Sequence, residues 1–283
     1  MTARAGIRLV SPGQLPPWHY GLLHDRPTMT LLWLTRGQGR ITVNGIRRGL
    51  GAHNAVFVPP GVLFALDPGP QALTLVLHAP ASEDALFPDE PLHLRIRDAR
   101  AQAELTGLLE GMQREISQNR PHLAEALSAQ VQLSGVWLRR QEAAGAADHP
   151  PDCAALRLAV AYAGSVSARF RSAAGPGDLA AELGVTGTHL TRACRTACGR
   201  SALDILSERR LHEARRLLAQ PAPPIGQIAR DLGFNSAAYF TRFIRRLTGQ
   251  SPSDLRALAQ QSPGTRPGGP ARLPPAPVRR ILR

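Results

Sequence analysis

The 283-residue sequence contains no lysine, only three cysteines, and few aromatic residues, which make up 5% of the chain. An odd and small number of cysteines argues against a secreted protein held together by disulfide bonds. No apolar run approaches the ~20 residues that span a membrane, and the N-terminus does not resemble a signal peptide. We therefore expect a cytoplasmic protein with no membrane partner, long enough for two domains with cores of their own.

The positive charge is carried by arginine alone and is unevenly distributed along the chain. The formal net charge is +13. Residues 1–151 carry 14 arginines and 13 acidic residues, residues 152–260 carry 15 arginines and 8 acidic residues, and residues 261–283 carry five arginines and no acid. An excess concentrated in one half is typical of a protein that binds a polyanion. A GC-rich genome would also favour arginine over lysine, so the positions of the arginines must decide what they contact.

The clearest motif is a helix, a tight turn and a second helix in residues 225–249. The first helix has one apolar face, and Gly233 follows it where the turn needs a left-handed residue. Ser236 is a suitable N-cap for the second helix, whose outer face is basic. The predicted buried stripe of that helix consists of Phe240, Ile244 and Leu247. This pattern predicts a helix-turn-helix unit whose second helix enters the DNA major groove.

A second unit of the same kind begins about 50 residues upstream. Residues 178–185 form a capped apolar helix that ends in glycine, and residues 186–195 form the next helix, with Leu190 and Cys194 directed inward. Between the units, residues 201–220 follow a helical period. A helix of ~20 residues spans ~30 Å, which is close to the ~34–36 Å between major-groove segments on one face of B-DNA. The two units could therefore enter successive major grooves.

Several short motifs in this region share an order and a spacing. They are Ala214-Arg215-Arg216-Leu217-Leu218, the stretch from Ile225 to Ala229, Gly233-Phe234, Tyr239-Phe240, Arg245-Arg246, Gly249 and Pro252. Through these motifs residues 154–257 resemble the AraC/XylS family of transcription regulators. Leu206, Ile244 and Leu255 stand where the family commonly has aromatic residues, and these substitutions concern packing.

The resemblance implies a double-stranded DNA partner and specific contacts. The expected base-contacting residues are Thr188, Thr191 and Arg192 on the first recognition helix, and Ala237, Ala238, Thr241 and Arg242 on the second. The expected contacts to the DNA backbone come from His189, Arg195, Ser236, Arg245 and Arg246. Arg192 and Arg242 are predicted to be the main direct readers, because a guanidinium can bind O6 and N7 of guanine. Cys194 and Cys198 stand four residues apart and could be read as a redox pair or half of a metal site, but Cys194 is expected to pack in the core.

The sequence pattern of the N-terminal part is typical of a small β-barrel. Short strands are predicted at 29–35, 40–44, 54–58, 62–66, 72–77 and 92–96. The dipeptide Asn44-Gly45 predicts a hairpin, and Gly/Pro turns separate the other strands. The stretches 36–39 and 57–61 resemble the cupin-like sensor domain of AraC-type regulators. The proline-rich residues 1–27 are expected to be irregular, either folded over a pocket or mobile.

Nothing in this barrel predicts chemistry. Its histidines are His19, His24, His53 and His78, which are scattered and form no His-x-His pair. Apolar residues follow Gly61, where a metal-binding barrel would place a histidine. We therefore expect no metal, no cofactor and no catalytic residue. An apolar effector pocket lined by Trp33, Phe57 and Phe64 stays open, beside the alternative that these rings belong to the core.

The fold class expected is α+β with two domains, the second all-α. The expected organisation is a cupin-like barrel with an N-terminal arm (1–97), a helical pair that packs on the barrel or forms a homodimer interface (98–142), a linker (143–152), a DNA-binding domain (153–259) and a disordered tail (260–283).

The predicted function is that of a sequence-specific transcription regulator modulated by a small effector or by dimerisation. The resemblance implies contact with RNA polymerase and favours activation, with repression left open. Two alternatives stand beside it: a cupin-type enzyme, and a ligand-independent dimerisation module, each fused to a DNA-binding domain.

Overall fold

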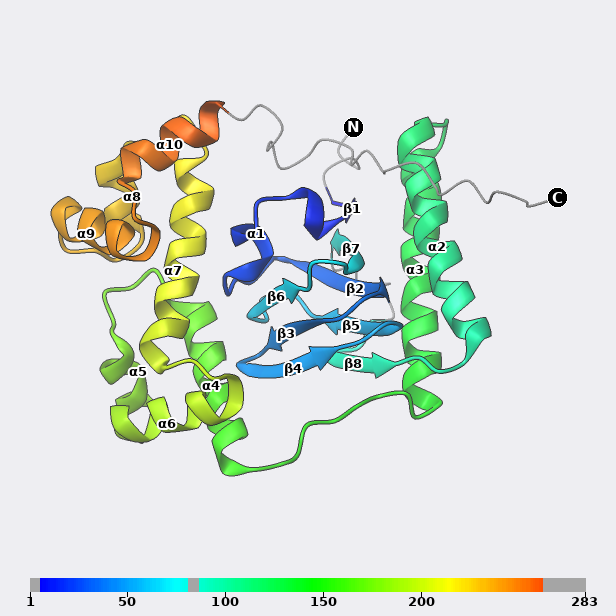
Figure 1. Cartoon of the computed structure of the whole chain (residues 1–283), viewed down its shortest axis with the longest axis horizontal. Coiled ribbons are helices and arrows are strands. Elements are labelled where there is room, and N and C mark those ends of the chain that lie inside the picture. Colours follow the sequence, from blue (N-terminus) through cyan, green and yellow to red (C-terminus); the bar gives the residue numbers. More distant parts are fainter. Residues whose placement is uncertain (1–5, 81–86, 262–283) are drawn as a thin grey trace.

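The computed structural model describes residues 6–80 and 87–261. A β-domain occupies the middle, the helical pair α2–α3 lies on one side of it, and the helices α4–α10 lie on the other (Figure 1). The predicted fold class, an α+β chain whose C-terminal half is all helical, is confirmed. Within the described ranges, none of the helices combines the length and the hydropathy that crossing a bilayer requires.

The β-domain consists of two antiparallel sheets. The first sheet has the order β1 (Arg8–Val10), β7 (Leu73–Pro80), β2 (Thr28–Arg36), β5 (Asn54–Val58) and β8 (Leu92–Arg95). The second has the order β4 (Ile46–Leu50), β3 (Gly39–Val43) and β6 (Phe64–Pro68). Asn44 and Gly45 join β3 to β4 with φ of 49° and 76°, the left-handed conformations that an Asn-Gly hairpin turn adopts. The hairpin prediction is thus confirmed.

The N-terminal arm is more regular than its prolines suggested. β1 extends the first sheet by pairing with β7, and a 3-10 turn (Pro12–Gln14) leads to the short helix α1 (Trp18–Gly21). His24 then forms an isolated bridge with Phe64. The sequence could not reveal this order, because β1 and α1 are too short to show a period and depend on partners far along the chain.

Two different apolar clusters hold the rings that were considered either for an effector pocket or for the core, which are Trp33, Phe57 and Phe64. Trp33 and Phe57 lie in the cluster between the first sheet and α2–α3, whereas Phe64 lies in the cluster enclosed by the two sheets. All three side chains are buried. Alternate residues of a strand face opposite sides, and β2 is apolar on both faces, so the sequence did not show which face Trp33 takes.

Two antiparallel helices cover the outer face of the first sheet. They are α2 (Ala99–Gln118) and α3 (Leu123–Ala143). Trp33 Nε1 donates to Thr106 Oγ1 (3.1 Å) and Trp137 Nε1 donates to the Ala101 carbonyl (3.0 Å), so both buried indoles have acceptors. The packing role foreseen for these helices is therefore realised on the sheet.

The segment between α3 and the C-terminal helices is docked on the β-domain. Ala147 bridges Leu94, and the Asp148 carboxylate forms ion pairs with Arg48 (2.6 Å) and Arg95 (2.7 Å). Its small residues and prolines predicted a linker. The contacts of Asp148 attach this segment to β4 and β8.

Within residues 154–261 the C-terminal part contains seven helices. They are α4 (Ala154–Arg169), α5 (Pro176–Glu182), α6 (Gly187–Cys198), α7 (Ala202–Leu218), α8 (Ile225–Asp231), α9 (Ala237–Thr248) and α10 (Pro252–Gln261). The long helix α7 connects α4–α6 at one end to α8–α10 at the other (Figure 1). Apart from the last two residues of α10, the predicted disordered tail lies outside the described residues.

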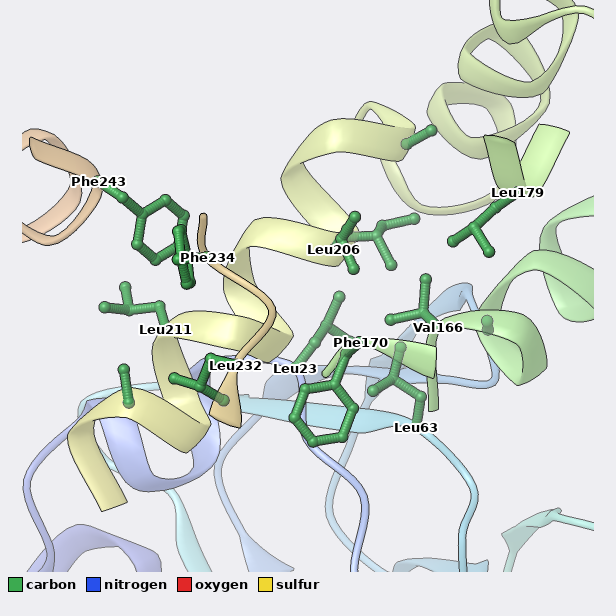
Figure 2. Packing of buried hydrophobic residues seen from close by; sticks show 14 of the residues in the cluster. Leu23, Leu63, Val166, Phe170, Leu179, Leu206, Leu211, Leu232, Phe234 and Phe243 are labelled. Carbon is green, nitrogen blue, oxygen red and sulfur yellow. The ribbon is translucent and has the colours of Figure 1, made fainter. Parts of the chain in front are cut away.

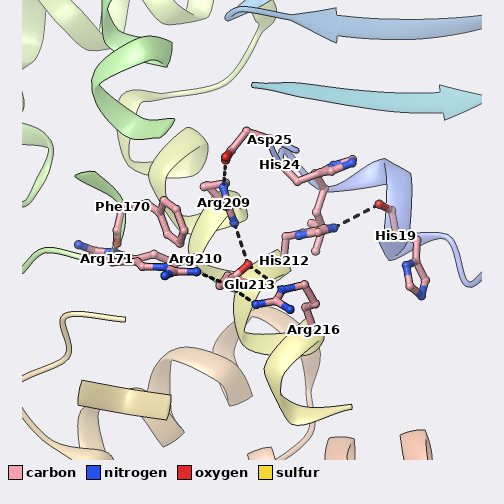
Figure 3. Close-up of polar contacts among 11 residues, drawn as sticks. His19, His24, Asp25, Phe170, Arg171, Arg209, Arg210, His212, Glu213 and Arg216 are labelled. Carbon is pink, nitrogen blue, oxygen red and sulfur yellow. Dashed lines mark hydrogen bonds and ion pairs between the residues drawn. The ribbon is translucent and has the colours of Figure 1, made fainter. Parts of the chain in front are cut away.

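The β-domain and the C-terminal helices share one apolar cluster. Leu23 and Leu63 of the β-domain lie against Val166 and Phe170 at the end of α4, and the same cluster continues along α7 (Figure 2). Polar contacts flank it, because Arg209 of α7 pairs with Asp25 and the His24 and His212 rings stack at 4.3 Å (Figure 3). The position of α7 relative to the β-domain is therefore set by side-chain packing as well as by the connecting segment.

Candidate nucleic-acid interface

Helices α6 and α9 are built by the same local rules. Thr186 Oγ1 accepts the backbone N–H of His189 (3.2 Å), and Ser236 Oγ accepts that of Tyr239 (3.1 Å). Each helix has 12 residues and ends at a glycine with a left-handed φ, 75° in one and 74° in the other. Because N-caps and glycine C-caps are local signals, both helices follow directly from the sequence.

The turns that precede these helices are also matched. Gly184 and Gly233 have φ of 70° and 74°. The two positions differ in their surroundings: a Cβ on Gly233 would overlap the Ser172 carbonyl, whereas the space around Gly184 is open. Gly233 therefore serves both the turn and the close approach of the loop after α4.

The inner faces of α6 and α9 are apolar, with one departure from the predicted stripe. Phe240 and Ile244 are buried as expected, but Leu247 is 40% exposed and Phe243 is buried in its place. The Phe243 ring packs against Phe234 with centroids 5.0 Å apart. Leu247 lies in the last turn of α9, one turn beyond this contact.

The two cysteines of α6 face the core. Cys194 and Cys198 are both buried, and burial raises the pKa of the Cys194 thiol to about 12. The Cys198 thiol donates to the Cys194 carbonyl (3.3 Å). In the described part of the chain no three His, Cys, Asp or Glu side chains are placed to hold a metal ion.

The outer faces of both helices carry the residues predicted to contact DNA. On α6, Thr188, His189, Arg192 and Arg195 are exposed and Thr191 is half-buried. On α9, Ala237, Ala238, Arg242, Arg245 and Arg246 are exposed, Thr241 is half-buried, and Ser236 at the N-cap is exposed. The structure thus brings each set together on one face of one helix. The Thr241 hydroxyl donates to the Ala237 carbonyl (2.9 Å), which leaves its methyl group for an apolar contact.

The structure separates arginines that hold the fold from arginines that remain available. Arg210 donates to the carbonyls of Phe170 (2.8 Å), Ser172 (2.7 Å) and Ala174 (3.0 Å), and so ties α7 to the loop after α4. Arg209 is buried in ion pairs. By contrast, no carboxylate among the described residues forms an ion pair with the arginines of the outer faces. These are Arg192, Arg195, Arg242, Arg245 and Arg246.

One exposed side chain on α9 was not among the predicted contacts. Tyr239 is 55% exposed, and the Arg242 guanidinium lies 5.9 Å from its ring centre. In the sequence Tyr239 stands next to Phe240 of the predicted buried stripe. The sequence did contain a signal for this contact, because Tyr239 and Arg242 are three residues apart and such pairs are neighbours on a helix surface.

Comparison with known proteins agrees with this geometry. Residues 179–258 match the family model of a helix-turn-helix domain. The Arabinose operon regulatory protein of Escherichia coli (strain K12) is 31% identical over 131 residues, which cover 46% of this chain and 44% of that protein. The HTH-type transcriptional regulator GlxA of Rhizobium meliloti is 44% identical over 73 residues, covering 26% of this chain and 22% of that protein. The chain thus spans less than half the length of these relatives.

Solved structures resemble this chain more loosely. A ToxT variant from Vibrio cholerae superposes with a TM-score of 0.42 at 13% identity and covers 89% of this chain and 97% of its own. The C-terminal domain of AraT from Geobacillus stearothermophilus superposes with a TM-score of 0.34 at 24% identity and covers 36% of this chain and 84% of its own. Both sequence relatives are named as regulators.

Proposed function

We propose that the chain is a sequence-specific DNA-binding transcription regulator of the AraC/XylS family. The match of residues 179–258 to the family model of a helix-turn-helix domain and the 31% identity to the arabinose operon regulatory protein support this proposal. One observation supports this most strongly. Two helices with matching caps each present arginines without an ion pair on an exposed face, while Arg209 and Arg210 of α7 are occupied by internal partners.

We propose that α6 and α9 read successive major grooves. They lie toward opposite ends of α7 (Figure 1), whose 17 residues make a rod of ~25 Å at ~1.5 Å per residue. The three hydrogen bonds of Arg210 attach α7 to the segment before α5. One chain would then recognise two half-sites about one helical turn apart.

Within each helix the residues take different roles in this proposal. Arg192 and Arg242 read guanine, and the methyl groups of the threonines and alanines contact thymine. The helices are held on the phosphates by His189, Arg195, Ser236, Arg245 and Arg246, with a strong salt dependence. Tyr239 orients Arg242 by a cation–π contact.

Selection of binding sites from genomic fragments with the full chain, at near-physiological salt, tests the function. A bipartite consensus with two half-sites one turn apart is the expected result. Uniform binding that disappears with added salt would mean that the basic face only holds phosphates, and the proposal would be wrong.

Single variants then test the assignment of roles. Arg242→Ala should cost about 1–3 kcal/mol of binding free energy on the selected site and little on unrelated DNA, because one bidentate base contact is lost. Arg246→Ala should weaken both equally and lower the salt slope by about one. Arg157→Ala, on the exposed surface of α4, is the charge-matched control. An equal loss on all sequences for Arg242→Ala would assign this arginine to the phosphates.

The remaining parts of the proposal concern regulation. We propose that the chain activates transcription by contacting RNA polymerase and that α2–α3 form the interface of a homodimer. The β-domain would transmit an effector signal through the cluster it shares with α4 and α7. Sedimentation of the full chain at several concentrations tests the homodimer, and a single monomeric species would contradict it.

A further inference from the structure

A small cleft lies where the second sheet meets the junction of α6 and α7. Its volume is about 50 Å³. The lining residues are Gly21, Arg40, Thr42, Arg47, Ala65, Asp67 and Arg200. We propose that this cleft is an oxyanion-binding site that takes one carboxylate or phosphate group. Neither the apolar pocket considered from the sequence nor the DNA-contacting faces of α6 and α9 include it.

Strand register brings these side chains to one face. Arg40 and Thr42 are two residues apart on β3 and therefore point to the same side of the sheet. Arg47 of β4 lies opposite Thr42, and Asp67 of β6 lies opposite Arg40. The intervening Ile41 is buried in the cluster between the two sheets, so this set of polar residues faces outward, toward the C-terminal helices.

Arg200 contributes a pre-positioned cation from the other side of the cleft. Its Nε donates to Glu208 Oε1 (2.7 Å) and its Nη1 donates to Thr42 Oγ1 (3.1 Å). The side chain is 24% exposed, so the guanidinium is held in place while its edge still reaches the solvent. Thr42 belongs to the β-domain, and Arg200 belongs to the link between α6 and α7. An anion bound here would contact both parts of the chain.

Arg40 and Arg47 supply the unpaired charge. Both are exposed, and neither has an ion pair with a described carboxylate, although Asp67 lies across the sheet from Arg40. The Arg47 guanidinium lies beside Gly199, 3.6 Å from the position that a Cβ would take there. Gly199 is the C-cap of α6, and the partial negative charge at a helix C-terminus favours a cation at this place.

The chemistry of the cleft selects an oxyanion. Three guanidinium groups surround it, Asp67 is the single acid among the described residues of its lining, and Glu208 already offsets Arg200. The planar fork of arginine matches the oxygens of a carboxylate or phosphate, while a cation would be repelled. The size of the cleft suits one such group, either free or attached to a larger molecule outside it. That group could come from a small effector or from the DNA backbone.

Calorimetric titration of the full chain with inorganic phosphate, at constant ionic strength, tests the site without DNA. Saturable binding is expected. It should weaken about tenfold or more in Arg40→Ala and in Arg47→Ala, the loss typical of a hydrogen bond to a charged group. Arg36→Ala is the matched control, because Arg36 is exposed on the β-domain but does not line the cleft. Equal weakening in all three variants would reveal general charge screening and overturn the site.

The same variants, titrated with the selected DNA, identify the source of the group. A salt slope lowered by about one in Arg47→Ala, but not in Arg36→Ala, assigns the cleft to a DNA phosphate. An unchanged slope together with saturable phosphate binding assigns it to a free anion. If phosphate does not bind and the slope does not change, the proposal is wrong. Only the titration with DNA rests on the proposed function, and phosphate binding would survive the failure of DNA recognition.

Discussion

Glu213 of α7 is the centre of the ion-pair network that holds the linker helix, and its removal should be costly. Its side chain is 4% exposed and pairs with Arg171 (2.6 Å), Arg209 (3.4 Å) and Arg216 (2.8 Å) (Figure 3). Arg209, itself 5% exposed, continues the network to Asp25 of the β-domain. Burial alone would raise the pKa of Glu213, but the hydrogen bond from Arg216 and the surrounding guanidinium charges lower it to about 2.

The size of the effect follows from this pKa. A fall from the ordinary 4.5 to about 2 on folding corresponds, at ~1.4 kcal/mol per unit, to about 3 kcal/mol of stability near neutral pH. Loss of one partner from a buried ion pair costs a similar ~3–5 kcal/mol. We therefore expect Glu213→Gln to lower the free energy of unfolding by about 3 kcal/mol at pH ~7.

Urea unfolding of the two proteins, followed by tryptophan fluorescence and circular dichroism, measures this difference. Because the pKa of Glu213 is depressed in the folded protein, its contribution is complete above pH ~4.5 and is lost as the pH falls toward ~2. The gap between wild type and Glu213→Gln should therefore shrink by more than half at pH ~3. The control is Glu182→Gln, whose exposed pair with Arg169 should contribute less than ~1 kcal/mol.

Two outcomes would contradict a stabilising role of the ionised Glu213 carboxylate. One is a difference below ~1 kcal/mol at neutral pH, the range of an exposed pair. The other is a gap that stays constant down to pH ~3, which would mean that the cost of the substitution comes from altered packing rather than from the ionised carboxylate.

Further predictions concern the turns and the thiols. Gly233→Ala should lower the free energy of unfolding by several kcal/mol, because its Cβ would overlap the Ser172 carbonyl, whereas Gly184→Ala should cost only the ~1–2 kcal/mol of a left-handed alanine. Thermal and urea unfolding compare the two, and equal losses would contradict the close contact. In the native protein, a thiol reagent should modify the half-buried Cys153 well before Cys194, whose burial raises its pKa to about 12. Modification at equal rates would mean that α6 opens readily.

Local signals made the helix-turn-helix units readable from the sequence. The N-caps Thr186 and Ser236, the turn glycines and the apolar spacing each act within a few residues, so they specify the two helices without knowledge of the rest of the chain. The same holds for the Asn44-Gly45 hairpin. For that reason the sequence alone predicted three features. They are the resemblance to a known family, the fold class and the helix faces expected to contact DNA.

Features that join distant residues were decided only by the tertiary structure. Whether Trp33 faces the helices or the barrel interior depends on which sheet face each covers, and β2 is apolar on both. The N-terminal arm is ordered because β1 pairs with β7. The linker is attached to the β-domain because Asp148 forms ion pairs with Arg48 and Arg95.

The arginines show most clearly the difference between what can be predicted from the sequence and what depends on the tertiary structure. The sequence shows that the C-terminal half is basic, and helical periodicity shows which arginines lie on the outer faces of α6 and α9. It could not determine that Arg209 and Arg210 of α7 are occupied by a carboxylate and by backbone carbonyls 36 to 184 residues away, or that Arg40 and Arg47 meet Arg200 at one cleft. An arginine carries the same charge at every position in the sequence. Which groups it pairs with depends on the residues that folding brings next to it.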